Sequence, residues 1–221
     1  MGLATNIEHW DMSAAIGMAT EGVRAKYNVG GGGGGFGAAD MEIASKLDGG
    51  KVLAAVDTVG REHRHLELWS MYAYASPLWN RHSNRDQLFE HIINDWVIQR
   101  ANVGEFIQER TFDRVKALLP LIVGGMALEQ FSGAEVTQKN GRLEYLPVTP
   151  RSVFIEVLVG VDCEQKDVHS ETFTKKRTRY YQNNWARIAE HIEFIKSLIV
   201  KYDTLARKMY KKELEKQMMA I

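Results

Sequence analysis

The strongest periodic pattern in this sequence is an apolar stripe toward its C-terminal end. Its members recur at alternating spacings of four and three residues, which places them on one side of an α-helix at about 100° per residue. A helix of this kind packs its apolar side against a core. The pattern therefore predicts a long, core-packed helix that carries Tyr181, Trp185, Ile188, Ile192, Ile195, Ile199 and Tyr202 on its buried side.

The opposite side of that helix carries cations and amides. Lys and Arg bind phosphates and guanine edges, whereas Asn and Gln pair with adenine. Arg177 falls nearer the apolar side, which predicts that the first turn frays, bends or belongs to a preceding loop. We interpret the outward side as the nucleic-acid-binding face of a recognition helix. The candidate contact residues are Lys175, Lys176, Arg179, Gln182, Asn183 and Arg187.

Charge is distributed unevenly along a chain whose formal net charge is zero. From Lys166 onward there are 13 Lys and Arg residues against 7 Asp and Glu, whereas residues 1–165 carry 15 against 21. A basic region of this kind suits a polyanionic partner such as double-stranded DNA. The same cations could instead form the ordinary solvated face of an amphipathic helix, and the sequence leaves that alternative open.

Six consecutive glycines, Gly30 to Gly35, interrupt the N-terminal part of the chain. Glycine loses the most backbone freedom on ordering, and the lysine and hydroxyl of a phosphate-binding loop are missing, so the tract predicts a linker. We expect an N-terminal helix in residues 1–29, the glycine linker in 30–37, a helical body in 38–148 and a basic helical nucleic-acid-binding region in 149–221.

Apolar spacing and capping signals predict that the body is made mostly of helices. We expect breaks at Gly49-Gly50 and at Ser76-Pro77, and an end or a bend at Pro120. The Asn140-Gly141 pair between two β-prone runs predicts a hairpin near residues 135–147. The predicted helices are Ile7–Tyr27, 40–47, 51–59, 61–75, one starting at 83–86, 112–119, 121–131 and Ser152–Val161.

Apolar spacing also predicts which residues of three of these helices face the core. In the first helix they are Trp10, Ala14, Met18 and Val23; in the helix 61–75 they are Leu66, Trp69, Met71 and Ala73; in the helix that starts at 83–86 they are Leu88, Ile92, Trp96 and Gln99.

The predicted fold class is therefore mainly α, a multi-helix globular body with one β-hairpin and a long basic C-terminal helix. The helix that ends near Gly160 and the basic helix from about Ser170 allow a helix-turn-helix arrangement. The stretch between them, Val161 to His169, is longer than the usual turn of three or four residues. Such a motif would be irregular.

Little in the sequence indicates catalysis or cofactor binding. Cys163 is the only cysteine, and the closest histidines, His63 and His65, lie on different sides of a helix, so no metal motif follows. We expect no enzymatic activity, no cofactor and no metal. The apolar stretch Ala117–Leu128 is too short to cross a bilayer, and no secretory signal is evident, so we expect a cytoplasmic protein without a membrane partner.

Two stretches carry a family resemblance. The segment from Leu66 to Pro77, with Trp69, and the segment from Tyr180 to Trp185 followed by a helix to Asp203 resemble phage late-gene antitermination proteins of the Q type. The resemblance implies a helical protein that binds a DNA element, contacts RNA polymerase and makes it resistant to termination. Some relatives carry a zinc ribbon, which a chain with one cysteine does not allow.

The functional prediction is a DNA-binding transcription regulator of phage type that acts as an antitermination factor and contacts RNA polymerase or another host protein. The alternative is a protein-only interaction module, such as a phage inhibitor of a host factor, whose basic face binds an acidic partner. The two differ in one measurable property, because only the first binds duplex DNA near physiological salt.

Overall fold

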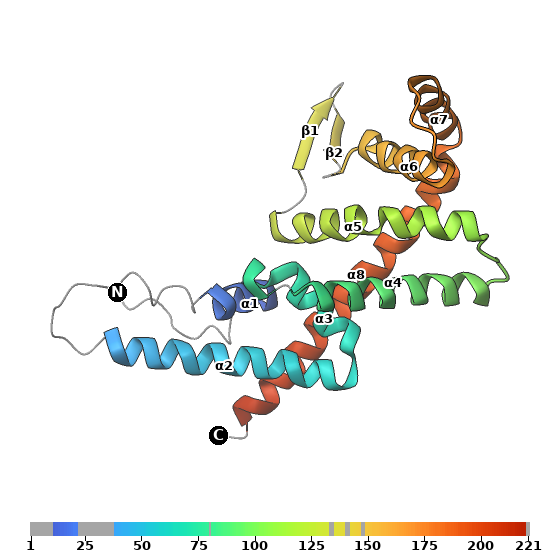
Figure 1. The fold of residues 1–221 in the computed structure, drawn as a ribbon. Coiled ribbons are helices and arrows are strands. Elements are labelled where there is room, and N and C mark those ends of the chain that lie inside the picture. Colours follow the sequence, from blue (N-terminus) through green and yellow to red (C-terminus); the bar gives the residue numbers. More distant parts are fainter. Residues whose placement is uncertain are drawn as a thin grey trace. The chain divides into compact units, whose positions relative to one another are not determined.

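The computed structural model describes residues 11–21, 38–79, 81–132, 135–139, 142–146 and 149–219. Across these residues the protein is mainly α-helical, which confirms the predicted class (Figure 1). The chain divides into two compact units, one from residues 1–88 with 201–221 and one from residues 89–200. The boundaries predicted from the sequence are different ones and stay a prediction. The glycine linker at 30–37 lies outside the described residues.

The first unit contains three helices from the N-terminal part of the chain. They are α1 (Met12–Glu21), α2 (Ala38–Glu62) and α3 (Arg64–Tyr74), and each packs against the other two. A short 3-10 helix, η3 (Pro77–Trp79), leads to the start of α4 (His82–Asn102), and the end of α8 (Trp185–Met219) completes the unit. The predicted core residues Leu66 and Trp69 are buried in α3.

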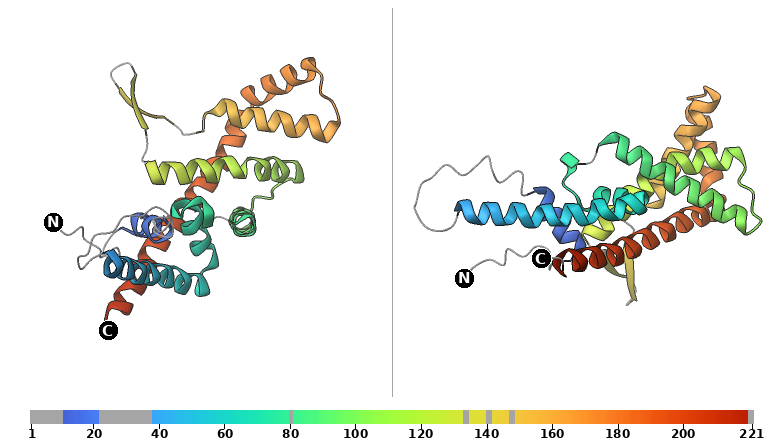
Figure 2. Two further views of the ribbon diagram at one scale, coloured as in Figure 1. Left: turned by 60° about the vertical axis from the view of Figure 1, so that its left-hand side comes forward. Right: turned by 90° about the horizontal axis from the view of Figure 1, so that it is seen from below.

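The second unit contains the remainder of α4, the first part of α8 and the elements between them. These are α5 (Glu109–Ser132), β1 (Glu135–Lys139), β2 (Arg142–Leu146), α6 (Arg151–Lys166) and α7 (Glu171–Asn183). The strands β1 and β2 pair antiparallel, with Thr137 opposite Glu144, and the predicted Asn140-Gly141 turn lies outside the described residues. Helix α6 packs against α5 on one side and α7 on the other (Figure 2).

Two predicted helix breaks are wrong. Helix α2 runs without interruption through Gly49 and Gly50, and a Cβ atom on Gly49 would lie at an ordinary contact distance, 3.5 Å, from the Cα atom of Ala19 in α1. A glycine inside a helix costs only about 1 kcal/mol relative to alanine, and the burial of Val52, Ala55 and Val56 in the same helix outweighs that cost. Helix α5 likewise continues through Pro120, whose ring is exposed, so this residue does not end the element. The other expectation, a bend at Pro120, stays a prediction.

The predicted face of the first helix is also wrong. We expected Trp10, Ala14, Met18 and Val23 near one side, but Ala14 and Met18 are exposed and the other two lie outside the described residues. Because α1 is apolar nearly all round, several stripes fit its sequence equally well. The buried residues of α1 are Met12, Ala15, Ile16, Ala19 and Thr20.

The C-terminal region departs from its prediction at two points. Helix α6 does not end near Gly160 but continues to Lys166, where Asp167 takes the left-handed conformation with φ of 51°. The predicted single basic helix is broken at Asn184, which separates α7 from α8. The apolar stripe is nevertheless buried on both sides of the break, except for half-buried Trp185.

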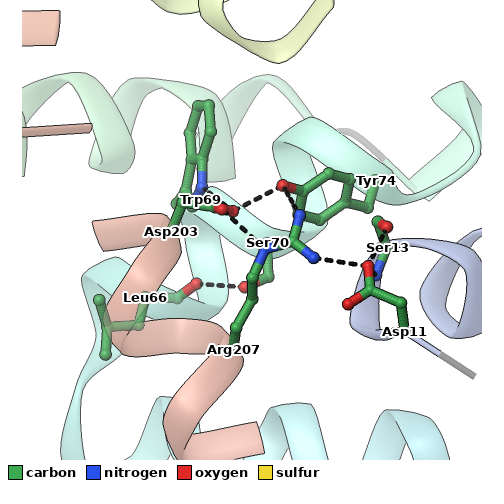
Figure 3. A network of polar contacts seen from close by, with 8 residues as sticks. All are labelled: Asp11, Ser13, Leu66, Trp69, Ser70, Tyr74, Asp203 and Arg207. Atoms are coloured by element: carbon green, nitrogen blue, oxygen red, sulfur yellow. Dashed lines mark hydrogen bonds and ion pairs between the residues drawn. The ribbon is translucent and has the colours of Figure 1, made fainter. Parts of the chain in front are cut away.

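A buried polar network ties α3 to the end of α8 in the first unit (Figure 3). The carboxylate of Asp203 accepts hydrogen bonds from Trp69 Nε1 at 3.1 Å, Tyr74 Oη at 2.6 Å and Arg207 Nε at 2.7 Å. Arg207 also reaches Asp11, just before α1, at 2.5 Å. A buried carboxylate needs such partners, since desolvation is costly without them. The network therefore fixes how these three elements pack.

His191 of α8 gives the second unit a predicted dependence on pH. Burial, together with the nearby positive charge of Arg100, lowers the pKa of His191, although Glu190 and Glu105 oppose this shift. The folded protein thus favours neutral histidine, whereas the unfolded chain takes up a proton below its pKa of about 6.5. Stability contributed by neutral His191 is complete above about pH 6.5 and is lost as the pH falls below that value.

We expect the wild-type protein to lose more free energy of unfolding between pH 7.5 and pH 5.0 than His191→Gln, as measured by urea denaturation at both pH values. The comparison cancels the contributions of the other titrating groups, which the two proteins share. Equal losses in the two proteins would show that His191 does not titrate differently on folding.

Candidate nucleic-acid interface

Helices α6 and α7 form an antiparallel hairpin with a short connection, residues 167–170. The left-handed Asp167 ends α6, and its backbone N–H donates to the carbonyl oxygens of Cys163 and Glu164. The side chain of Ser170 then caps α7 by accepting a hydrogen bond from the Phe173 amide at 3.3 Å. These two local signals set the position at which α7 begins.

All six predicted contact residues are exposed. Five of them belong to α7 and span about 120° of its circumference, with Gln182 at one edge and Lys176 at the other. Tyr181, which is 1% exposed, lies on the opposite side. The sixth residue, Arg187, lies in α8 beyond the break at Asn184. The side chains of Lys175, Lys176, Arg179 and Gln182 border an open hollow of about 540 Å³.

Within the described residues, most of the cations on this side of α7, as well as Arg187, have no ion-pair partner. Lys175 pairs with Glu171 at 2.7 Å on the surface, an arrangement that contributes little energy. Lys176, Arg179 and Arg187 have no ion-pair partner within the ranges that the structure describes. We name the exposed set Lys175, Lys176, Arg179, Gln182 and Asn183 the α7 face.

Arg177 points the other way. Its guanidinium contacts Asp162 of α6 at 2.6 Å through Nε, and the same carboxylate accepts a hydrogen bond from Tyr181 Oη at 2.6 Å. Arg114 of α5 reaches the second carboxylate oxygen at 3.0 Å. The side chain of Asp162 is only 4% exposed. This cluster, the Asp162 clamp, connects α5, α6 and α7.

The electrostatics of the clamp favour its charged form. Burial alone would raise the pKa of Asp162, but hydrogen bonds from Tyr181, Arg114 and Arg177 outweigh it and hold the pKa below its ordinary value. Burial and the hydrogen bond to Asp162 raise the pKa of Tyr181 to about 12. The tyrosine therefore stays a hydrogen-bond donor, and the carboxylate stays ionised, across the physiological range.

Sequence reasoning placed Arg177 near the apolar side of its helix but did not find its partner. The feature of the sequence that indicates this partner is Asp162, because it shares a helix face with Leu158 and Val159 and is thus an acid within an apolar stripe. An acid in that position needs a cation from another element.

Within the ranges that the structure describes, no group of histidine, cysteine or acidic side chains is arranged to hold a metal ion. The same ranges contain no helix with the length and apolar character that a bilayer crossing demands. Comparisons with known proteins found no matching family model, no matching curated protein and no matching solved structure.

Proposed function

We propose that this protein is a transcription regulator that binds double-stranded DNA through the α7 face. The observation that carries the proposal is that α7 pairs one of its cations inside the unit and leaves others exposed. Arg177 is used internally, whereas Lys176 and Arg179 stand in solvent beside two amides. A helix that exposes both phosphate-binding and base-reading groups has the composition of a recognition helix.

The α6–α7 hairpin supports α7 in a way that suits this role. The Asp162 clamp and the buried Tyr181 hold α7 against α6, so its outer face is presented by a fixed scaffold. A face held in this way loses little conformational entropy on binding. In this proposal α7 lies in the major groove and α6 supports it as the other helix of an antiparallel hairpin, in place of the crossed helices of a helix-turn-helix.

A titration of fluorescently labelled duplex DNA at two salt concentrations tests the proposal. We expect binding near physiological salt, and an affinity that falls as salt is raised, because phosphate contacts release counterions. The rival class, a protein-only interaction module whose basic face binds an acidic protein, predicts no affinity for the duplex. An absence of binding at both salt concentrations would remove the proposal in favour of that rival.

The amides of the α7 face are proposed to read bases. We expect wild-type protein to enrich a common motif from a pool of random duplexes, and Gln182→Ala with Asn183→Ala to lose that motif. Affinity for unrelated duplexes should stay within about threefold, because phosphate contacts supply most non-specific binding. Sequencing of the selected pools provides the measurement. A motif that persists unchanged in the variant would contradict base reading by these two residues.

The family resemblance extends the proposal to antitermination of phage late transcription, with RNA polymerase as the protein partner. In that role the protein binds its DNA site without catalysing a reaction, and it acts on RNA polymerase next to that site. Transcription in vitro across a terminator checks this extension, with read-through expected only when the protein and its DNA site are both present. Unchanged termination would leave DNA binding as the proposal and remove the antitermination role.

A further inference from the structure

The loop between α4 and α5 exposes neighbouring apolar side chains. Phe106 is 90% exposed and Val103 is 69% exposed. Within the described ranges, Met219 at 87% is the only other large apolar residue exposed to this extent, and it lies at the end of α8. Single exposed apolar residues are common on protein surfaces, whereas apolar side chains exposed together mark interaction sites.

The backbone of this loop is held at both ends. The Glu105 amide donates to the Arg100 carbonyl at 3.0 Å, and the Gly104 amide donates to the Ala101 carbonyl at 2.9 Å. Gly104 has a φ of 81°, which is the left-handed backbone conformation that glycine adopts readily. These two bonds around Gly104 are the usual way in which an α-helix ends at a glycine. At the other end, the Thr111 and Phe112 amides donate to the carbonyl of Gln108. Phe106 therefore projects from a short, fixed segment.

An ion-pair cluster lies beneath the loop. The buried guanidinium of Arg100 contacts Glu105 at 2.6 Å and Glu190 of α8 at 2.8 Å, and it stacks on the Phe194 ring. A helix end of this type commonly closes with an apolar contact at the position that Glu105 occupies. Here the ion pair between Glu105 and Arg100 takes the place of that apolar contact, and Phe106 stays exposed. One cation shared by two carboxylates leaves an excess of negative charge beside the loop.

We propose that this loop inserts Phe106 into an apolar pocket of a partner protein whose border carries lysine and arginine. A rigid aromatic side chain surrounded by polar groups is the usual anchor of a protein interface. The negative charge supplies the complement to a basic border and repels an anionic bilayer. This inference is independent of DNA binding by the α7 face.

A second copy of this chain suits Phe106 less well. The hollow bordered by the α7 face carries the cations, but none of the described residues that line it is apolar. A second, apolar hollow of about 400 Å³ lies between α6 and α7, but Glu156 and Glu164 line it. Acids on both surfaces would repel each other. A different protein is therefore the expected occupant.

Photo-crosslinking identifies the occupant. The full-length protein carrying benzoylphenylalanine in place of Phe106 is expressed in its native cells, and the crosslinked protein is identified and purified. Its affinity is then measured for wild-type protein, Phe106→Ser and the control Leu128→Ser, which also removes an exposed apolar side chain of this unit. We expect at least tenfold weaker binding for Phe106→Ser, unchanged binding for Leu128→Ser, and weaker binding as salt is raised.

Three results would overturn the proposal. They are crosslinking only to a second copy or to lipid, no crosslinked protein at all, and equal affinity of wild-type protein and Phe106→Ser for the protein identified. Because Phe106 is almost fully exposed, its replacement should leave the melting temperature unchanged. Circular dichroism of both variants makes certain that a loss of binding is not a loss of folding.

Discussion

Replacing Lys176 and Arg179 with glutamate is expected to weaken duplex binding by a factor on the order of 100 near physiological salt. Both side chains are exposed and have no ion-pair partner within the described ranges, so their charge is available to phosphates. Reversal removes two attractive contacts and adds two repulsive ones. The slope of log affinity against log salt should also fall by about 1.8, because each phosphate contact contributes about 0.9.

A matched control is available in the first unit. Lys211 and Lys212 of α8 are exposed, and their replacement by glutamate changes the net charge by the same amount. This control should keep its affinity within about threefold, since only long-range electrostatics changes. Equal weakening by the two double variants would mean that overall charge, and not the α7 face, determines binding.

Replacing Asp162 with alanine is expected to lower the free energy of unfolding by about 3 to 5 kcal/mol. The substitution leaves Arg114 and Arg177 without their carboxylate, although their side chains are only 16% and 19% exposed. It also removes the acceptor for the buried hydroxyl of Tyr181. Urea denaturation followed by circular dichroism measures the loss.

Glu171→Ala provides the comparison for this prediction. Glu171 pairs with Lys175 on the surface of α7, where both side chains are more than three-quarters exposed. An ion pair in that setting contributes about 0.5 kcal/mol or less. A similar small loss for Asp162→Ala would show that the clamp does not hold α7 in place.

The helices could largely be predicted from the sequence, but their ends could not. Apolar spacing correctly placed Leu88, Ile92 and Trp96 on the buried side of α4, although Ile93 is buried as well and Ile98 is exposed. Helix breaks depend on tertiary contacts that local sequence does not report. Gly49 indicates a break in isolation, yet the packing of buried Val52, Ala55 and Val56, which follow it, keeps α2 continuous.

Some features of the candidate site could likewise be predicted from the sequence, and others could not. Exposure of the α7 face followed from the position of the apolar stripe, since residues opposite a buried side face solvent. Arg177 was placed correctly near the apolar side, but the frayed, bent or loop-like first turn expected from that position is wrong, because Arg177 lies inside the regular helix α7 and pairs with Asp162. That pairing, with Arg114 as the third member, joins residues far apart in sequence. The exposed Phe106 had no signal, because an apolar residue in a loop is ordinarily expected to be buried.

Crosslinking from DNA locates the surface of the protein that contacts the duplex. A duplex containing photoreactive bases is irradiated with the full-length protein, and the attached peptides are identified by mass spectrometry. Crosslinks concentrated in residues 171–187 are the expected result. Crosslinks confined to other segments, or an absence of crosslinks under conditions in which a known DNA-binding protein reacts, would contradict duplex recognition by the α7 face.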